Sequence, residues 1–158
     1  MTGVLNRNPG VAEATLQRRE VYAELIIDFV HVDPETVKLS INVKGTDRIV
    51  GITDSIRPAG LKDGPSTSGG LEIVKKGLLI TIKGTETIAG SAATMHDVFK
   101  NIISLGYSIN EAVAMTSYNA SKNLNIEGGR IEEGLSADFV LLKDNLSIHS
   151  VYVNGEKK

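Results

Sequence analysis

Two polar side chains follow stretches that have the composition of buried strands. His31 lies near the end of the apolar run Val21–Val32, and Asp54 directly follows the run Arg48–Thr53. In parallel barrels the carboxyl ends of the strands are where catalytic groups collect. A carboxylate there can act as a general base, and a histidine can bind an anion or carry a proton. Each also has a structural interpretation, with Asp54 capping the next turn and His31 as a hydrogen-bonded loop residue.

Two further features have the composition of a binding site. Ala89, Gly90 and Ser91 lead into a predicted helix, so their backbone N–H groups could face an anion or the polar atoms of a ligand. The simpler interpretation is that Ser91 is an N-cap preceded by small residues. Arg7 lies in an Arg-Asn-Pro-Gly turn, where by itself it is only an exposed basic residue.

Composition excludes several classes of function. The net charge of -2, without clustered basic residues, gives no basis for nucleic-acid binding. No unbroken apolar window of roughly 18 residues is present, so no membrane span is expected. The beginning of the chain does not resemble a signal peptide, and we expect a cytoplasmic protein. The chain has no cysteine and its three histidines lack metal-ligand spacing, so these residues alone predict no metal site.

The elements that would position His31 and Asp54 form a parallel crossover unit. The strand predicted over Val21–Val32 precedes a helix that begins at Asp33-Pro34, with an acidic N-cap and proline in the first turn, and ends at Gly45. The strand predicted over Arg48–Thr53 follows. Strand, helix and strand in this order favour an α/β sheet or barrel.

The second half of the sequence changes character twice. Residues 57–70 are rich in Gly, Pro and Ser, and are predicted to be a surface excursion. The remaining predictions are a β-hairpin over Leu71–Val74 and Leu78–Ile82, an amphipathic helix from Met95 closed by Gly106, a helix from the capping box at Ser108 to about Asn119, and short strands at Ala137–Leu142 and Ser150–Val153.

In order, and over nearly the whole chain, these pieces resemble the N-acetylglucosamine-6-phosphate deacetylase family of the amidohydrolase superfamily. The closing Gly-x-Ile-x-x-Gly-x-x-Ala-Asp pattern is shared across the superfamily, whereas three other elements narrow the resemblance to the deacetylases. The residues that carry it are Arg7-Asn8-Pro9-Gly10, Asp28 with His31-Val32, Thr53-Asp54-Ser55, Ala89-Gly90-Ser91, and Gly129-Arg130-Ile131 with Gly134 and Ala137-Asp138.

The resemblance implies an α/β fold, in which residues 1–125 are the C-terminal part of a (β/α)8 barrel with a hairpin excursion near 71–82. Residues 126–158 would supply strands of a small β-sandwich. It also implies a cytoplasmic homodimer that hydrolyses the acetamide of a phosphosugar with a divalent metal ion, zinc or iron. The implied roles are Asp54 as catalytic base, His31 and Arg7 as substrate-binding residues, Arg7 at the phosphate of the partner's site, and the backbone of Ala89, Gly90 and Ser91 along the sugar.

Two departures from the family pattern qualify these expectations. The family's metal ligands, a glutamate and two histidines, would lie upstream of Met1, so the chain is expected to be a fragment without a metal site of its own. Phe29 stands where the family commonly has glycine, and would either narrow the pocket or pack in the core. The alternatives are an inactive remnant, an oligomeric module that binds sugar phosphate, or another amidohydrolase such as a dihydroorotase-like enzyme. Arg7 and His31 argue against the last, because they suit a phosphosugar.

Overall fold

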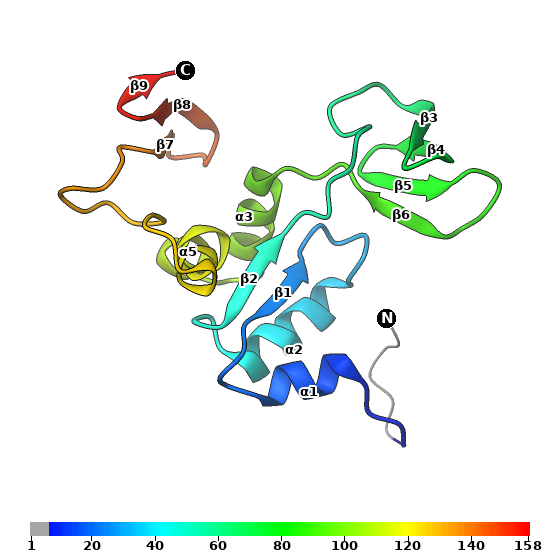
Figure 1. The fold of residues 1–158 in the computed structure, drawn as a ribbon, viewed down its shortest axis with the longest axis horizontal. Helices are drawn as coiled ribbons and strands as arrows, with labels where there is room; N and C mark the ends of the chain where they lie inside the picture. Colours follow the sequence, from blue (N-terminus) through cyan, green and yellow to red (C-terminus); the bar gives the residue numbers. More distant parts are fainter. Residues whose placement is uncertain (1–6) are drawn as a thin grey trace.

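A parallel two-stranded sheet lies in the middle of the molecule (Figure 1). The computed structural model describes residues 7–158. β1 (Ala23–Ile26) and β2 (Ile49–Ile52) pair in register from Ala23 with Ile49 to Ile26 with Ile52. The two strands therefore end at the same level, and the segments that carry His31 and Asp54 leave the sheet side by side. The predicted crossover unit is confirmed.

The helix between these strands begins and ends where the sequence predicts. α2 spans Pro34–Lys44, and the side chain of Asp33 accepts a hydrogen bond from the Glu35 N–H at 2.9 Å. Gly45 closes the helix with φ of 87°, and its N–H donates to the carbonyl of Ile41 at 2.8 Å. Few residues other than glycine adopt this backbone conformation without strain.

β1 is shorter than the strand predicted over Val21–Val32. The chain leaves the sheet after Ile26, because the buried carboxylate of Asp28 accepts hydrogen bonds from the N–H groups of Val30 and His31. An aspartate that binds the backbone two and three residues ahead folds the chain into a turn. Apolar composition alone could not reveal this turn, and the longer strand was a wrong prediction.

A short N-terminal helix is attached to α2 by a buried lysine. α1 (Val11–Gln17) packs against α2, and the Lys44 ammonium donates to the carbonyl oxygen of Thr15 at 2.6 Å and to that of Arg18. Cations are favourable at a helix C-terminus, where carbonyl groups lack intrahelical partners. Burial of Lys44 lowers the pKa of its ammonium group.

Four antiparallel strands form a sheet beside the parallel pair, in the order β3-β4-β5-β6 (Figure 1). β4 (Leu71–Lys76) and β5 (Leu79–Ile82) form a hairpin, and β6 spans Ile88–Ser91. Residues 57–70, predicted to be a surface excursion, contain the strand β3 (Gly64–Ser68), which the sequence did not predict. β3 is an edge strand. Pro65 is tolerated there because proline has no N–H, and an edge strand needs hydrogen-bond donors on one side only.

The helices that follow pack on β2. α3 (Met95–Ser104) begins with a capping box between Thr94 and Asp97, which corrects the interpretation of Ser91 as an N-cap. The helix predicted from Ser108 begins as α4 (Ile109–Val113), widens into the π-helix η1 (Ala114–Tyr118) and continues as α5 (Asn119–Leu124). It therefore runs five residues beyond its predicted end.

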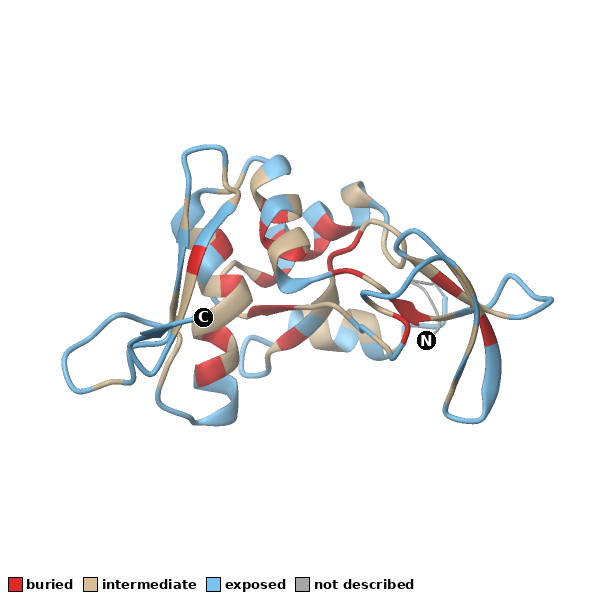
Figure 2. Cartoon of the chain, turned by 90° about the horizontal axis from the view of Figure 1, so that it is seen from above, coloured by how far each residue is buried: buried red, intermediate tan, exposed pale blue. Residues whose placement is uncertain are grey.

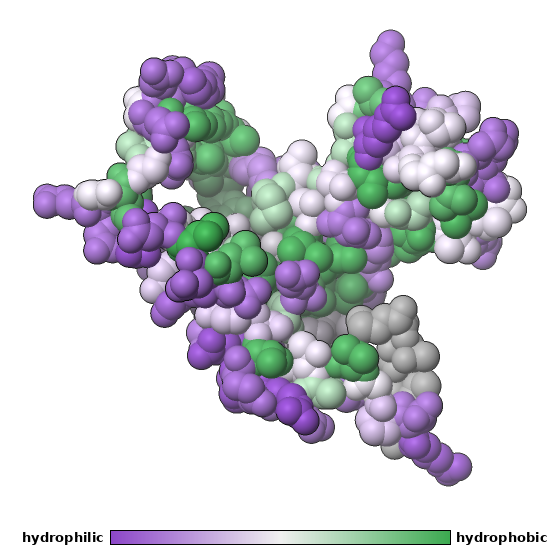
Figure 3. Space-filling view, viewed as in Figure 1, coloured by the Kyte–Doolittle hydropathy of each residue, from purple (hydrophilic) through white to green (hydrophobic). Residues whose placement is uncertain are grey.

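The C-terminal segment forms a small antiparallel sheet. Its strands are β7 (Phe139–Leu142), β8 (Ile148–Val153) and β9 (Glu156–Lys157), with Asn154 and Gly155 in the predicted turn. This sheet stands away from the parallel pair (Figure 1), and apolar patches lie over it in the space-filling view (Figure 3). Val140 is 50% exposed and Leu141 is 43% exposed. Consecutive residues of a strand point to opposite faces, so β7 exposes apolar side chains on both of its faces.

The hydrophobic core lies around the parallel strands, where buried residues concentrate (Figure 2). It joins both strands to α2, α3, α4 and η1, through Ala23, Ile27, Val37, Ile41, Ile49, Val98, Phe99, Ile102, Ala112 and Met115. Among residues 7–158, no helix is long and apolar enough to cross a membrane.

Asn119 fixes the start of β2 from α5, and its removal should destabilise the fold. The buried Asn119 amide donates to the carbonyl oxygens of Thr46 at 2.8 Å and Ile49 at 2.7 Å. We expect Asn119→Ala to lower the free energy of unfolding in urea by about 1–3 kcal/mol, because two carbonyls lose their donor. Asn123→Ala, at an exposed position of the same helix, should change it by less than about 0.5 kcal/mol. Equal effects of the two substitutions would contradict this role.

Candidate active site

His31, Asp54 and Ser91 meet where three strands end. His31 Nε2 lies 3.6 Å from Asp54 Oδ2. The Ser91 N–H donates to the backbone carbonyl of Asp54 at 2.9 Å, and the Ile56 N–H donates to the carbonyl of Ser91 at 3.1 Å. These bonds join the end of β6 to the segment after β2, next to the turn after β1. The structure thus brings together the two side chains that the sequence singled out for chemistry.

Asp28 holds the His31 ring in place. His31 Nδ1 lies 2.8 Å from Asp28 Oδ2, while Asp28 Oδ1 accepts from the N–H groups of Val30 and His31, each at 2.9 Å. Asp28 is only 2% exposed. Burial raises the pKa of this carboxyl, but hydrogen bonds from the backbone, the His31 ring and the Ser91 hydroxyl together hold the pKa below its ordinary value. Asp28 is therefore a buried, ionised partner of His31.

The Asp54 carboxylate faces both the histidine and solvent. Its side chain is 49% exposed, whereas that of His31 is 14% exposed. Asp54 has φ of 50°, in the left-handed region that residues other than glycine, asparagine and aspartate rarely adopt. This backbone conformation directs the chain from β2 toward β6, where the carbonyl of Asp54 meets Ser91.

Phe29 adopts a second left-handed conformation at the same site. Its φ is 61°, and its side chain packs against the hydrophobic core. Of the two interpretations left open by the sequence, the structure therefore supports packing in the core. A bulky residue with positive φ is strained by about 1–3 kcal/mol, and such strain is concentrated at functional sites.

Gly90 allows the close approach between β6 and the segment after β2. A Cβ atom at Gly90 would lie 2.8 Å from Ile56 Cγ2 and 3.0 Å from the Asp54 carbonyl oxygen. Ala89, Gly90 and Ser91 belong to β6 rather than to a helix start, and the Ser91 N–H is already bound by Asp54. The Ser91 N–H was expected to face a ligand. That expectation is wrong, because this N–H donates its hydrogen bond to the backbone carbonyl of Asp54.

Arg7 is not brought to the other site residues within one chain. It lies in an exposed turn before α1, and among residues 7–158 its guanidinium forms no hydrogen bond or ion pair.

The site residue whose role the sequence alone did not reveal is Asp28. Its spacing three residues before His31 was a usable signal, because a loop aspartate at that spacing can bind both the backbone and the side chain of the histidine.

The described part of the chain offers no complete metal site. Across residues 7–158, no group of three or more His, Asp or Glu side chains could hold a metal ion. His31, Asp28 and Asp54 are close together, but Asp28 is occupied by backbone N–H groups and by the ring. The cluster can position a histidine and present one solvated carboxylate, which suits proton transfer and the binding of a polar ligand.

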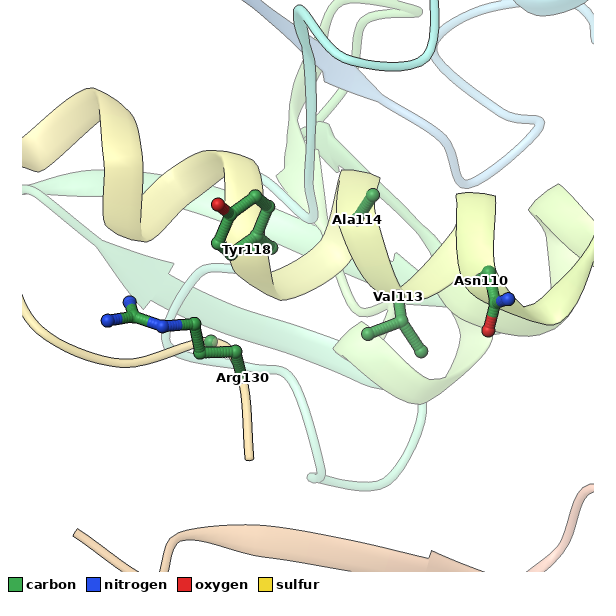
Figure 4. A pocket seen from close by; sticks show the side chains of 6 residues that line it. Asn110, Val113, Ala114, Tyr118 and Arg130 are labelled. Carbon is green, nitrogen blue, oxygen red and sulfur yellow. The ribbon is translucent and has the colours of Figure 1, made fainter. Parts of the chain in front are cut away.

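A depression lies between α4, η1 and the segment that carries Arg130 (Figure 4). Tyr118 and Val113 line it from the helices, and Arg130 lines it from the loop (Figure 4). None of the residues that the sequence singled out for catalysis or binding lines it. The lining residues are Asn110, Val113, Ala114, Tyr118, Gly129 and Arg130.

Known proteins resemble this chain over nearly its whole length. It is 32% identical over 154 residues to an N-acetylglucosamine-6-phosphate deacetylase from Lysinibacillus sphaericus, covering 95% of this chain and 39% of that protein. It is also 32% identical over 160 residues to a putative N-acetylgalactosamine-6-phosphate deacetylase from Escherichia coli K12, covering 99% of this chain and 94% of that protein. The chain therefore spans less than half of one relative and nearly all of another.

A solved structure has a similar fold. An Asp-to-Ala mutant of the N-acetyl-D-glucosamine-6-phosphate deacetylase from Mycobacterium smegmatis, in complex with N-acetyl-D-glucosamine-6-phosphate, superposes with a TM-score of 0.94 at 31% identity. The match covers 99% of this chain and 42% of that one. A family model described as the amidohydrolase family matches residues 15–158. This chain belongs to the amidohydrolase family.

Proposed function

We propose that this chain takes part in the hydrolysis of the acetamide of N-acetylglucosamine 6-phosphate, giving glucosamine 6-phosphate and acetate. The observation that carries the proposal is the His31–Asp54 pair, 3.6 Å apart at the ends of two neighbouring parallel strands. The deacetylases named above support the substrate class. In this proposal residues 1–125 are the C-terminal part of a (β/α)8 barrel, and residues 126–158 supply strands of a small β-sandwich.

Asp54 is the general base in this scheme. Its half-exposed carboxylate accepts a proton from the water that attacks the acetamide carbonyl carbon, and returns it to the nitrogen as the C–N bond breaks. A divalent metal ion, zinc or iron, would supply activated water when bound. Because residues 7–158 contain no group of three or more metal-ligating side chains, the ligands would come from outside these residues.

His31 and Arg7 would bind the phosphosugar. His31 lies beside Asp54, and Arg7 lies in an exposed turn apart from it. In a homodimer, the separate position of Arg7 allows it to reach the phosphate in the partner's site. An arginine forms charge-assisted, bidentate hydrogen bonds with phosphate oxygens. Ala89 and Gly90 would line the sugar from β6.

Binding without turnover is the second candidate function. One observation favours it: residues 7–158 contain no group of three or more side chains that could hold a metal ion. Such a protein would bind the phosphosugar as an oligomer. Calorimetric binding in the presence of zinc, with no release of acetate, would favour this function over catalysis.

Asp54→Asn should abolish turnover while leaving substrate affinity largely intact. The amide cannot accept the water proton, so we expect kcat to fall by about 100-fold or more. The assay joins this chain to the part of the Lysinibacillus sphaericus deacetylase that it does not cover, and measures acetate release. Asp144→Asn, at an exposed position, is the matched control. Full turnover by the Asp54 variant would rule out Asp54 as the base.

Arg7→Ala should raise KM with little change in kcat in the same hybrid enzyme. Loss of a phosphate contact weakens substrate binding in the ground state and the transition state alike. We expect a rise of about tenfold or more, from the energy of a charged hydrogen bond. Arg18→Ala provides the control, since Arg18 is also exposed and pairs only loosely with Glu20 at 3.7 Å. An unchanged KM for the Arg7 variant would contradict phosphate binding.

A further inference from the structure

We propose that Asp28 is a positioning residue that keeps a proton on His31 Nδ1, so that Nε2, the nitrogen facing Asp54, is the unprotonated one in the neutral ring. The tautomer follows from the geometry of the described chain alone. Its consequence for the substrate rests on the proposed function. Fixing a histidine tautomer through its other ring nitrogen is a general means of setting which nitrogen reacts.

The hydrogen bonds around Asp28 leave one possible arrangement. Oδ1 accepts from two backbone N–H groups, and Oδ2 lies 2.8 Å from His31 Nδ1. An ionised carboxylate has acceptors only, so the short contact requires a hydrogen on Nδ1. The Ser91 hydroxyl on β6 helps to lower the pKa of this carboxyl. The hydrogen-bond partners of this carboxylate lie in the turn after β1.

The two ring nitrogens of His31 lie at different distances from their carboxylates, and the shorter distance is at Nδ1, as the Nδ1–H tautomer requires. Nδ1 lies 2.8 Å from its carboxylate, whereas Nε2 lies 3.6 Å from that of Asp54. An N–H donor at Nε2 would draw a carboxylate to about 2.7–3.2 Å. Two acceptors that face each other stay farther apart. The longer contact is therefore expected where Nε2 presents a lone pair.

A neutral His31 consequently presents an acceptor to the open side of the site. The charged groups that face the ring are Asp28 in its own loop and Asp54 after β2. Only a ring protonated at both nitrogens can donate to a phosphate oxygen while Nδ1 stays bound to Asp28. Under the proposed function, a neutral His31 therefore accepts a hydrogen bond at Nε2 from a hydroxyl of the phosphosugar.

The test is a long-range ¹H–¹⁵N correlation spectrum of the histidine rings in the full chain without ligand, at a pH where the rings are neutral. His31→Gln assigns the His31 signals among the three histidines. We expect the Nδ1–H tautomer to dominate in the wild type. In Asp28→Asn, whose amide can donate to Nδ1, the tautomer ratio should shift toward Nε2–H by about tenfold or more. Asp144→Asn should leave the ratio unchanged.

A wild-type His31 that carries its proton on Nε2 would overturn the proposal, and so would an unchanged ratio in a folded Asp28→Asn variant. If that variant does not fold, the wild-type tautomer alone decides. Adding N-acetylglucosamine 6-phosphate afterwards separates the two ideas. A ligand that leaves the ring signals unmoved counts against the proposed function, while the tautomer measured before its addition still stands or falls by itself.

Discussion

The buried carboxylate of Asp28 is the interaction on which the candidate site depends. It ends β1 by binding two N–H groups of the following turn, and it fixes the plane of the His31 ring with its second oxygen. Leaving such a group without its donors would cost about 1–3 kcal/mol for each unmet bond, so the turn and the ring position stabilise each other. The same carboxylate contacts Ser91, which ties the turn to β6.

Backbone strain accompanies this arrangement on both parallel strands. Phe29 and Asp54 each adopt positive φ in the segment that follows a strand, and neither is a glycine. The core contacts of the Phe29 side chain and the hydrogen bond between Ser91 and the Asp54 carbonyl offset this strain. Such conformations persist only where surrounding interactions hold them in place. They therefore mark a site where the backbone is strained and side chains are held in a fixed orientation.

Sequence patterns predicted the elements whose signals are local. The ends of α2 followed from Asp33, Pro34 and Gly45, and the start of α3 lay close to the first residue of its apolar periodicity. The juxtaposition of His31 and Asp54 was also predictable, because parallel strands deliver their carboxyl ends to one edge of the sheet. The proposed roles of these residues came from the family resemblance and not from spacing.

Features that depend on distant partners could not be predicted in this way. β3 forms because β4 offers an edge to a segment of loop-like composition, and β6 forms by pairing with β5 and contacting the segment after β2. The occupied N–H of Ser91 depends on a carbonyl 37 residues earlier in the chain, at Asp54. Composition and periodicity carry no information about such partners.

We propose that the phosphosugar binds at the surface formed by His31 and Asp54. The most direct measurement is a titration of the ¹⁵N-labelled chain with N-acetylglucosamine 6-phosphate, followed by backbone amide shifts. Binding there predicts saturable shifts at His31, Asp54 and Ser55, and none at Val113, Tyr118 or Arg130 around the depression between α4 and η1. Shifts confined to that depression, or no saturable shift at the strand ends, would contradict it.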